Sequence, residues 1–341
     1  ARLREFLFDR DFYRSVLTLG LPIAAQNLLS SSANLIDTVM VGQLGEVSLS
    51  AVGMAGQWSF LMFLFFFGFS SGSSVFFSQY WGIKDLSRIR HTYTLGFANV
   101  FIISLIFMVV GYCFPAQVIR VFTNDEVVVA EGVLYLRVAV FAYVAQCVNT
   151  YGCALLRATE EVRLPMISNI IAVLTNTFLN WVFIYGRLGA PEMQIEGAAL
   201  GTVIARLVEC GSLVTYFFVF DKRIGYRIQD LFMKCGDHVR VYITYAIPVM
   251  VSDTLLALGN SAVSIIMGHI GASFVAANSI ISQTVRLSTV FNQGLSSASS
   301  VITGNTLGKG ERDKAVMRRA IGPISCGSCA GSGTSSRSSS C

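Results

Sequence analysis

FLMFLFFFGF, residues 60–69, and ANVFIISLIFMVVGYCF, residues 98–114, contain no charged side chain. A helix needs about 20 mainly apolar residues to cross the hydrocarbon core of a bilayer, and the apolar segments around these runs reach that length. Of the 341 residues, 53% are hydrophobic and 13% are charged, whereas soluble domains carry roughly 25% charged residues. Because no sustained alternation of polar and apolar residues indicates a membrane β-barrel, we expect a bundle of membrane-spanning helices.

Charged segments and segments with glycine or proline divide the apolar sequence into eight expected spans. These are residues 16–41, 48–81, 91–114, 128–156, 165–186, 197–220, 241–268 and 275–305. The first is longer than the core of a signal peptide and has no small-residue cleavage motif after it, so we expect it to be retained. The expected fold class is an all-α polytopic membrane protein.

Basic residues are distributed unevenly between the two sets of expected loops. Nineteen Lys and Arg residues fall in one set, at 2–14, 84–90, 157–163, 222–240 and 309–319. The other set holds Arg120 and Arg187. Since basic loops are retained in the cytoplasm, we expect a multi-pass protein of the inner (plasma) membrane with a cytoplasmic N-terminus. The net charge of +5 then reflects topology, and we expect no nucleic-acid partner.

A shift of 226 residues aligns the chain with itself without gaps over about sixty residues. Identical residues recur at equal spacing, in the pairs Pro22 and Pro248, Asn34 and Asn260, Gln57 and Gln283, and Gly82 and Gly308. Six expected spans separate the starts of the two copies, so both copies enter the membrane in the same direction. This pattern predicts a parallel repeat of six-helix halves, an architecture of transporters whose substrate path lies between the halves.

The repeat predicts four regions. They are a complete six-helix bundle at residues 1–220, a cytoplasmic linker at 221–240, the first two helices of a second bundle at 241–319, and a low-complexity tail at 320–341. Four helices of the second half are therefore expected to be missing. Cys326 and Cys329 have metal-ligand spacing, but a structural zinc site needs four ligands, so we expect no metal site.

Five motifs along the chain are typical of one protein family. They are Gly20-Leu21-Pro22, Asp37 with Gly42 and Gly45, LLRAT at 155–159 before Pro165, Asn176 and Asn180 before FIYG at 183–186, and residues 248–259. Over residues 10–319 the sequence resembles the multidrug and toxic compound extrusion (MATE) family, in particular its NorM-like branch. The resemblance implies two six-helix bundles in a V shape. It also implies a secondary antiporter that exports small organic cations in exchange for Na⁺ or H⁺ and needs no cofactor.

Asp37 and Asp253 are the leading candidates for the cation or substrate coupling site, because an ionisable side chain within a membrane span is costly and usually functional. Asp37 lies about twenty residues into the first span and hence in the outer half of the membrane. The repeat places Val263 at the equivalent position. Asp253 follows Pro248, which frees a backbone carbonyl that can join a carboxylate as a cation ligand. The alternative for both is a structural role.

Neutral polar residues accompany these carboxylates. We expect Asn149, Asn176 and Asn180 to line a polar cavity that faces Asp37, since amide oxygens suit a hard alkali cation. Supporting polar residues are Asn34, Gln57 and Gln283, and the equivalence of the two glutamines favours a packing role through interhelical hydrogen bonds. Arg206 and Glu209 stand three apart on one helix face and are expected to pair.

Two other functions compete with drug export. One is a truncated fragment that does not transport. The other is a flippase of the same superfamily for lipid-linked precursors, which needs basic residues in its cavity, where Arg137, Arg206 and Arg286 are available. We expect no enzyme, because the spans contain no H-E-x-x-H motif, no pair of glycine-flanked aspartates and no Ser/His dyad. The substrate, the choice of Na⁺ or H⁺ and the oligomeric state stay open.

Overall fold

A computed structural model describes residues 10–123, 125–221, 223–226, 230 and 293–311, and the single positions 244, 248, 251, 255 and 259. All regular elements in these ranges are helical. In chain order they are α2 (Arg10–Gly42), α3 (Glu46–Gly82), α4 (Leu86–Cys113), α5 (Pro115–Arg120), α6 (Glu126–Ala139), α7 (Ala142–Ala158), α8 (Arg163–Ile184), η1 (Arg187–Gly189), α9 (Gln194–Thr215), η2 (Tyr216–Phe220) and a helix at residues 293–308. The predicted all-α fold class is confirmed.

Four helices in the described part of the chain are long and apolar enough to cross a membrane, namely α3, α4, α8 and the segment Gln194–Val219. A fifth candidate is the pair of α6 and α7, which is bent by 57° at its break. The more polar α2, which has 33 residues, occupies the place of the first expected span. Most of the expected spans 241–268 and 275–305 and the whole tail 320–341 lie outside the described residues.

The fourth expected span differs from the structure. The sequence predicts one helix over residues 128–156, whereas the structure divides it into α6 and α7. Neither a proline nor a glycine occupies the break at residues 140–141. The break brings Val140 against Gly111 of α4, where any side chain larger than that of glycine would collide with it. Tertiary packing, which hydropathy does not record, accompanies the bend.

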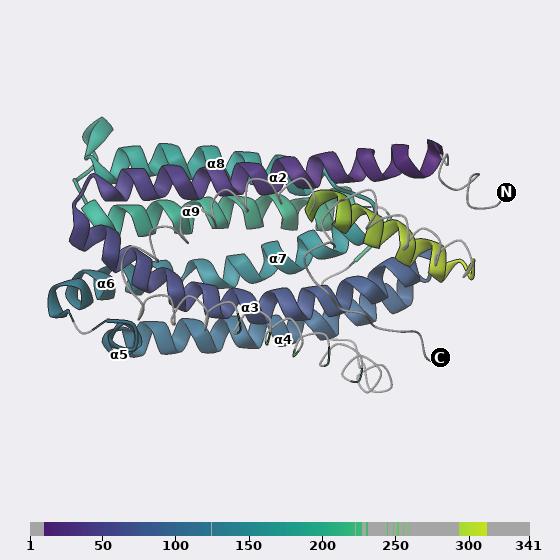
Figure 1. Cartoon of the computed structure of the whole chain (residues 1–341), viewed down its shortest axis with the longest axis horizontal. Helices are drawn as coiled ribbons and strands as arrows, with labels where there is room; N and C mark the ends of the chain where they lie inside the picture. The colour runs from purple at the N-terminus through teal and green to yellow at the C-terminus, as the bar shows by residue number, and fades with distance from the viewer. Residues whose placement is uncertain are drawn as a thin grey trace.

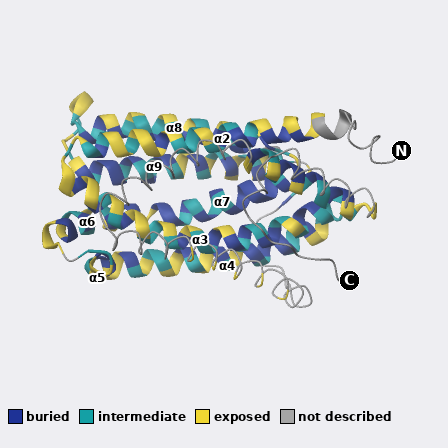
Figure 2. Ribbon diagram, viewed as in Figure 1, coloured by how far each residue is buried: buried dark blue, intermediate teal, exposed yellow. Residues whose placement is uncertain are grey.

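The long helices lie side by side along the longest axis of the molecule (Figure 1). α8 packs against α2 and α9, and α3 packs against α4, α6 and α7. Because α7 also contacts α4 and α9, most of its residues are buried (Figure 2). Large apolar side chains such as Leu35, Ile102 and Leu174 are exposed on outer helices, as expected of surfaces that face lipid.

Tyr151 of α7 lies at the centre of the main apolar core. Its ring centroid is 5.2 Å from that of Tyr93 on α4 and 5.9 Å from that of Phe77 on α3. Its hydroxyl donates to Oγ of Ser73, at 2.7 Å. A buried hydroxyl needs such a partner, so this one side chain joins three helices by both packing and hydrogen bonding.

We expect Tyr151→Phe to lower the free energy of unfolding by about 1 kcal/mol, because the ring stays in place while the bond to Ser73 is lost. The measurement is thermal unfolding of the purified chain in detergent. Tyr112→Phe is the matched control, because Tyr112 lies on α4 with 52% of its surface exposed and its removal should change nothing measurable. Equal effects of the two substitutions would contradict this account of the core.

Residues 293–308 cross α3 in very close contact near the carboxyl end of that helix. A Cβ atom on Gly82 would collide with the backbone of Asn305, and one on Gly308 would collide with the backbone of Gln79. Only glycine lets two helix backbones come this near. We call this contact the glycine seam.

The glycine seam is symmetric in the register of the internal repeat. The shift of 226 residues pairs Gly82 with Gly308 and Gln79 with Asn305, so the two backbone contacts exchange with each other. A contact between equivalent patches is the signature of two-fold symmetry. The seam therefore supports a parallel repeat with a pseudo-two-fold axis passing between the halves.

Described residues from three of the segments with basic residues lie together at one end of the molecule. Asn305 donates from Nδ2 to Oε1 of Glu160, in the loop between α7 and α8, at 2.6 Å. The neighbouring Glu161 pairs with Arg223 at 3.3 Å. The amino end of α2 lies toward the same end (Figure 1). This grouping is the one on which the expected cytoplasmic side depends.

Candidate functional site

The carboxylate of Asp37 lies between α2 and α8 and accepts hydrogen bonds from two amides. Asn180 donates from Nδ2 to Oδ1 of Asp37 at 2.8 Å. The Asn176 amide is oriented with its nitrogen toward Asp37, because both its nitrogen and its oxygen then have hydrogen-bond partners. In this orientation the nitrogen donates to Oδ1 at 2.7 Å and to Oδ2 at 3.2 Å. Both amides are buried. They hold the carboxylate in place without neutralising its charge.

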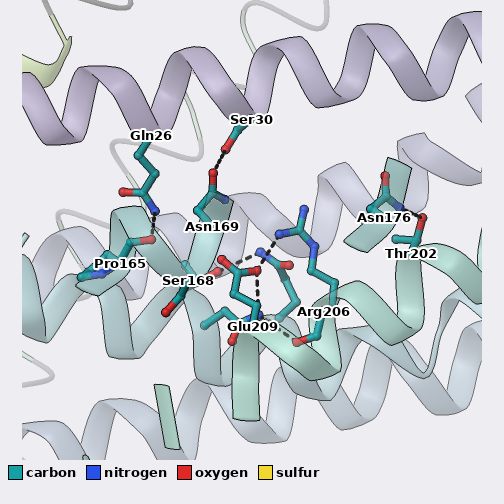
Figure 3. Close-up of polar contacts among 12 residues, drawn as sticks. Gln26, Ser30, Pro165, Ser168, Asn169, Asn176, Thr202, Arg206 and Glu209 are labelled. Carbon is teal, nitrogen blue, oxygen red and sulfur yellow. Dashed lines mark hydrogen bonds and ion pairs between the residues drawn. The ribbon is translucent and has the colours of Figure 1, made fainter. Parts of the chain in front are cut away.

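The spacing of residues on α8 and α9 explains this geometry. Asn176 and Asn180 are four residues apart, so they lie on one face of α8, directed at α2. Asn176 also contacts Thr202 of α9, with 3.3 Å between the side-chain atoms (Figure 3). Gly201 of α9 leaves room for Oδ1 of Asn180, which is buried and has no hydrogen-bond partner in the described part of the chain.

Two further residues complete the surroundings of Asp37. Tyr135 of α6 is buried near Thr202 and lies within electrostatic range of the carboxylate. Arg206, one turn after Thr202 on α9, attracts the carboxylate by its positive charge. Helices α2, α6, α8 and α9 therefore all contribute to this site, which we call the Asp37 site.

Asn149 belongs to a second polar cluster. From Nδ2 it donates to Oε2 of Glu209 at 3.0 Å and to the backbone oxygen of Arg206 at 3.3 Å. Arg206 pairs with Glu209 at 2.8 Å, which confirms the pairing expected from the sequence. The structure thus brings Asn176 and Asn180 to Asp37, as expected, but places Asn149 at this cluster.

Two of the supporting polar residues are described, and both lie away from the Asp37 site. Asn34 is exposed on α2, and Gln57 is exposed on α3. Asp253 and Gln283 lie outside the described residues, so their roles stay predictions. Of the two candidate carboxylates, Asp37 is the one that the structure describes, and it accepts hydrogen bonds from two amides of the neighbouring helix α8.

Sequence reasoning did not single out Thr202 or Tyr135. Thr202 lies one helical turn before Arg206, so the helical period of α9 places the two on one face and was the available signal. Tyr135 lies close to the break between α6 and α7, where a straight-helix prediction places side chains incorrectly. Its position could therefore not be read from periodicity.

A third polar group joins α2 to α8 and to Arg157 at the end of α7 (Figure 3). Gln26 of α2 accepts from Arg157 at 2.7 Å and donates to the backbone oxygen of Pro165 at 3.5 Å. Ser30 donates to Oδ1 of Asn169 at 3.2 Å. Polar side chains thus line the contact between α2 and α8 along much of its length. Among the described residues, no group of three or more His, Cys, Asp or Glu side chains could hold a metal ion.

Comparison with known proteins identifies relatives that are described as multidrug resistance proteins. The protein described as "Probable multidrug resistance protein NorM" from Agrobacterium fabrum is 27% identical over 304 residues, which cover 88% of this chain and 64% of that protein. The "Multidrug resistance protein NorM" of Vibrio cholerae is 23% identical over 315 residues, covering 90% and 67%. The chain thus spans roughly two thirds of the length of these relatives.

Solved structures share the fold. A crystal structure of MATE in the bent conformation has a TM-score of 0.81 at 19% identity and covers 92% of this chain and 69% of that chain. An outward-facing multidrug resistance MATE family transporter of the MOP superfamily also has a TM-score of 0.81, at 18% identity. The MatE family model matches residues 22–182 and 248–321, which is more than half of the chain. By this match, and in agreement with the motifs around Asp37, the chain belongs to the MatE family.

Proposed function

We propose that this chain carries the coupling half of a secondary active exporter that moves organic cations out of the cell in exchange for Na⁺ or H⁺. The observation that carries the proposal is the Asp37 carboxylate, which lies inside the helix bundle with two amide donors and, among the residues that the structure describes, no directly bonded cationic side chain. A charge kept inside the membrane without a fixed partner suits the binding of a mobile cation. The multidrug resistance names of two relatives support the class of substrate.

In the proposed mechanism, the coupling cation and the cationic substrate exclude each other by competing for the same negative charge. The glycine seam closes α3 against residues 293–308 at the end with the basic loops. We assign this end to the cytoplasm, so that Asp37 faces the opposite side. Cation binding from outside would then release substrate there, and the external cation gradient would supply the energy. Asp253 is the proposed second acidic group.

We also propose that the chain consists of four regions. Residues 1–220 form the complete bundle, 221–240 the linker, 241–319 the start of a second bundle and 320–341 a separate tail. The chain is placed in the inner membrane with its amino end in the cytoplasm, and it acts as a transporter without catalysing a covalent reaction. The pairing of Arg206 with Glu209 occupies one of the three arginines that a flippase would need for phosphate, which favours cation export.

The test is transport by the chain itself in proteoliposomes loaded with ethidium, an organic cation. We expect ethidium movement when an inward Na⁺ or proton gradient is imposed, and none after monensin or a protonophore collapses the gradient that drives it. Using each gradient separately identifies the coupling ion. Movement that ignores both gradients would refute coupling. No movement by a chain that still binds the cation would show that transport needs more than the part of its relatives that this chain spans.

A further inference from the structure

One guanidinium in this bundle pairs with one carboxylate and lies within electrostatic range of a second. Arg206 donates from Nη1 to Oε2 of Glu209 at 2.8 Å, and its charge also attracts Asp37. The side chain of Glu209 is 4% exposed, whereas that of Arg206 is 35% exposed. Glu209 is therefore the fixed, buried partner, and Arg206 has room to move.

Asn149 holds Glu209 in position. Its Nδ2 donates to the same Oε2 that accepts from Arg206, at 3.0 Å, and to the backbone oxygen of Arg206 at 3.3 Å. Asn149 itself is 3% exposed. With two donors directed at one oxygen, the Glu209 carboxylate is a prepared acceptor for the guanidinium. This contact fixes the resting position of Arg206 (Figure 3).

The stem of Arg206 begins close to the Asp37 site. Thr202 precedes Arg206 by four residues, so both lie on one face of α9. Thr202 contacts Asn176, and Asn176 donates to Asp37. A long, flexible arginine side chain anchored one turn away can turn toward either carboxylate. If it bound Asp37, it would neutralise the charge that a mobile cation needs.

We propose that Glu209 is a positioning residue that holds Arg206 away from Asp37 and so keeps the Asp37 carboxylate available to an exchangeable cation. This inference rests on the proposed role of Asp37 in coupling. It assigns the pair of Arg206 and Glu209 to the control of cation affinity. Removing the charge of Glu209 should then weaken cation binding at Asp37, and removing the charge of Arg206 should strengthen it.

The first experiment measures Na⁺ binding through thermal unfolding of the purified chain. NaCl replaces choline chloride at constant total salt and fixed pH, and each variant is compared with its own Na⁺-free sample, so that a change in folding is not read as a change in affinity. The part of the response that Asp37→Asn removes defines binding at Asp37.

We expect Glu209→Gln to weaken this binding about tenfold or more, because the released guanidinium pairs with Asp37. Arg206→Gln should strengthen it severalfold, because a positive charge near the cation is removed and the negative charge of Glu209 is left unneutralised. Arg206→Lys keeps the charge and should stay near wild type. The double variant Glu209→Gln with Arg206→Gln removes both charges and should return within a few-fold of wild type.

A purely structural pair predicts weaker binding in both single variants, and that result would overturn the proposal. If Glu209→Gln does not fold, Arg206→Gln decides alone, because its partly exposed side chain is easier to replace and its expected sign is opposite to structural damage. If wild type shows no Na⁺ response that depends on Asp37, sodium coupling at Asp37 is refuted, and a second readout tests the positioning role.

The second readout needs no cation. In wild type, Asp37→Asn should change the unfolding equilibrium little, because Arg206 is bound to Glu209. In the Glu209→Gln background the same substitution should destabilise the chain about tenfold in its unfolding equilibrium constant, since it breaks a new pair between Arg206 and Asp37. Equal effects in both backgrounds would show that Glu209 does not control where Arg206 binds.

Discussion

Replacing Asp37 by asparagine is expected to leave a folded chain that neither responds to Na⁺ nor couples a gradient to ethidium movement. The substitution keeps the size of the side chain and one oxygen for the amide donors of Asn176 and Asn180, so unfolding without Na⁺ should change by about 1 kcal/mol at most. At a hundred times Kd, Na⁺ adds about 2.7 kcal/mol to the stability of a protein that binds it. That increment should disappear completely.

Two variants on the same helix sharpen this result. Asn34→Ala lies three residues earlier on α2, where the side chain is exposed, and should leave both Na⁺ response and transport intact. Asp37→Glu keeps the charge but adds a methylene group against the buried Asn180, so it should bind the cation more weakly without losing it. A full Na⁺ response in Asp37→Asn would place the coupling cation elsewhere.

A methyl group added at the glycine seam is expected to give the largest loss of stability in the described part of the chain. Gly82→Ala directs a Cβ atom at the backbone of Asn305, and Gly308→Ala directs one at the backbone of Gln79. Because the obstacle is backbone in both cases, a side-chain rotation cannot relieve it. We expect each substitution to lower the free energy of unfolding by about 3 kcal/mol, measured by thermal unfolding in detergent.

Gly56→Ala is the matched control for this prediction. Gly56 lies on the same helix as Gly82, and a Cβ atom there meets nothing within 4 Å. Alanine is the better helix former by roughly 1 kcal/mol, so this variant should be unchanged or slightly more stable. If Gly82→Ala behaved in the same way as Gly56→Ala, the close approach of residues 293–308 to α3 would be wrong.

Much of the helical architecture could be predicted from the sequence, because the relevant signal is local. Apolar runs of membrane length required only a count of residues, and the first six expected spans each have a helical counterpart. The bend between α6 and α7 could not be predicted, since it accompanies the packing of Val140 on Gly111. That contact joins residues that are distant in sequence.

Some residues of the candidate site could likewise be predicted from the sequence, and others could not. Asp37 could be found because a carboxylate in a membrane span is rare, and Asn176 with Asn180 could be found because four residues make about one helical turn. The expectation that Asn149 also faces Asp37 was wrong in position, because which face of α7 meets α9 depends on how the helices are rotated. Hydropathy contains no information about that rotation.

The symmetry of the glycine seam has a consequence for the origin of the chain. Ser78 contacts Gly304, its equivalent in the repeat. Gly82 contacts the backbone of Asn305, and their repeat equivalents, Gly308 and Gln79, make the same contact in return. A surface that meets its own copy in this way is self-complementary. A single six-helix ancestor with this surface could form a homodimer, and duplication and fusion of its gene would then join two subunits whose contact already existed.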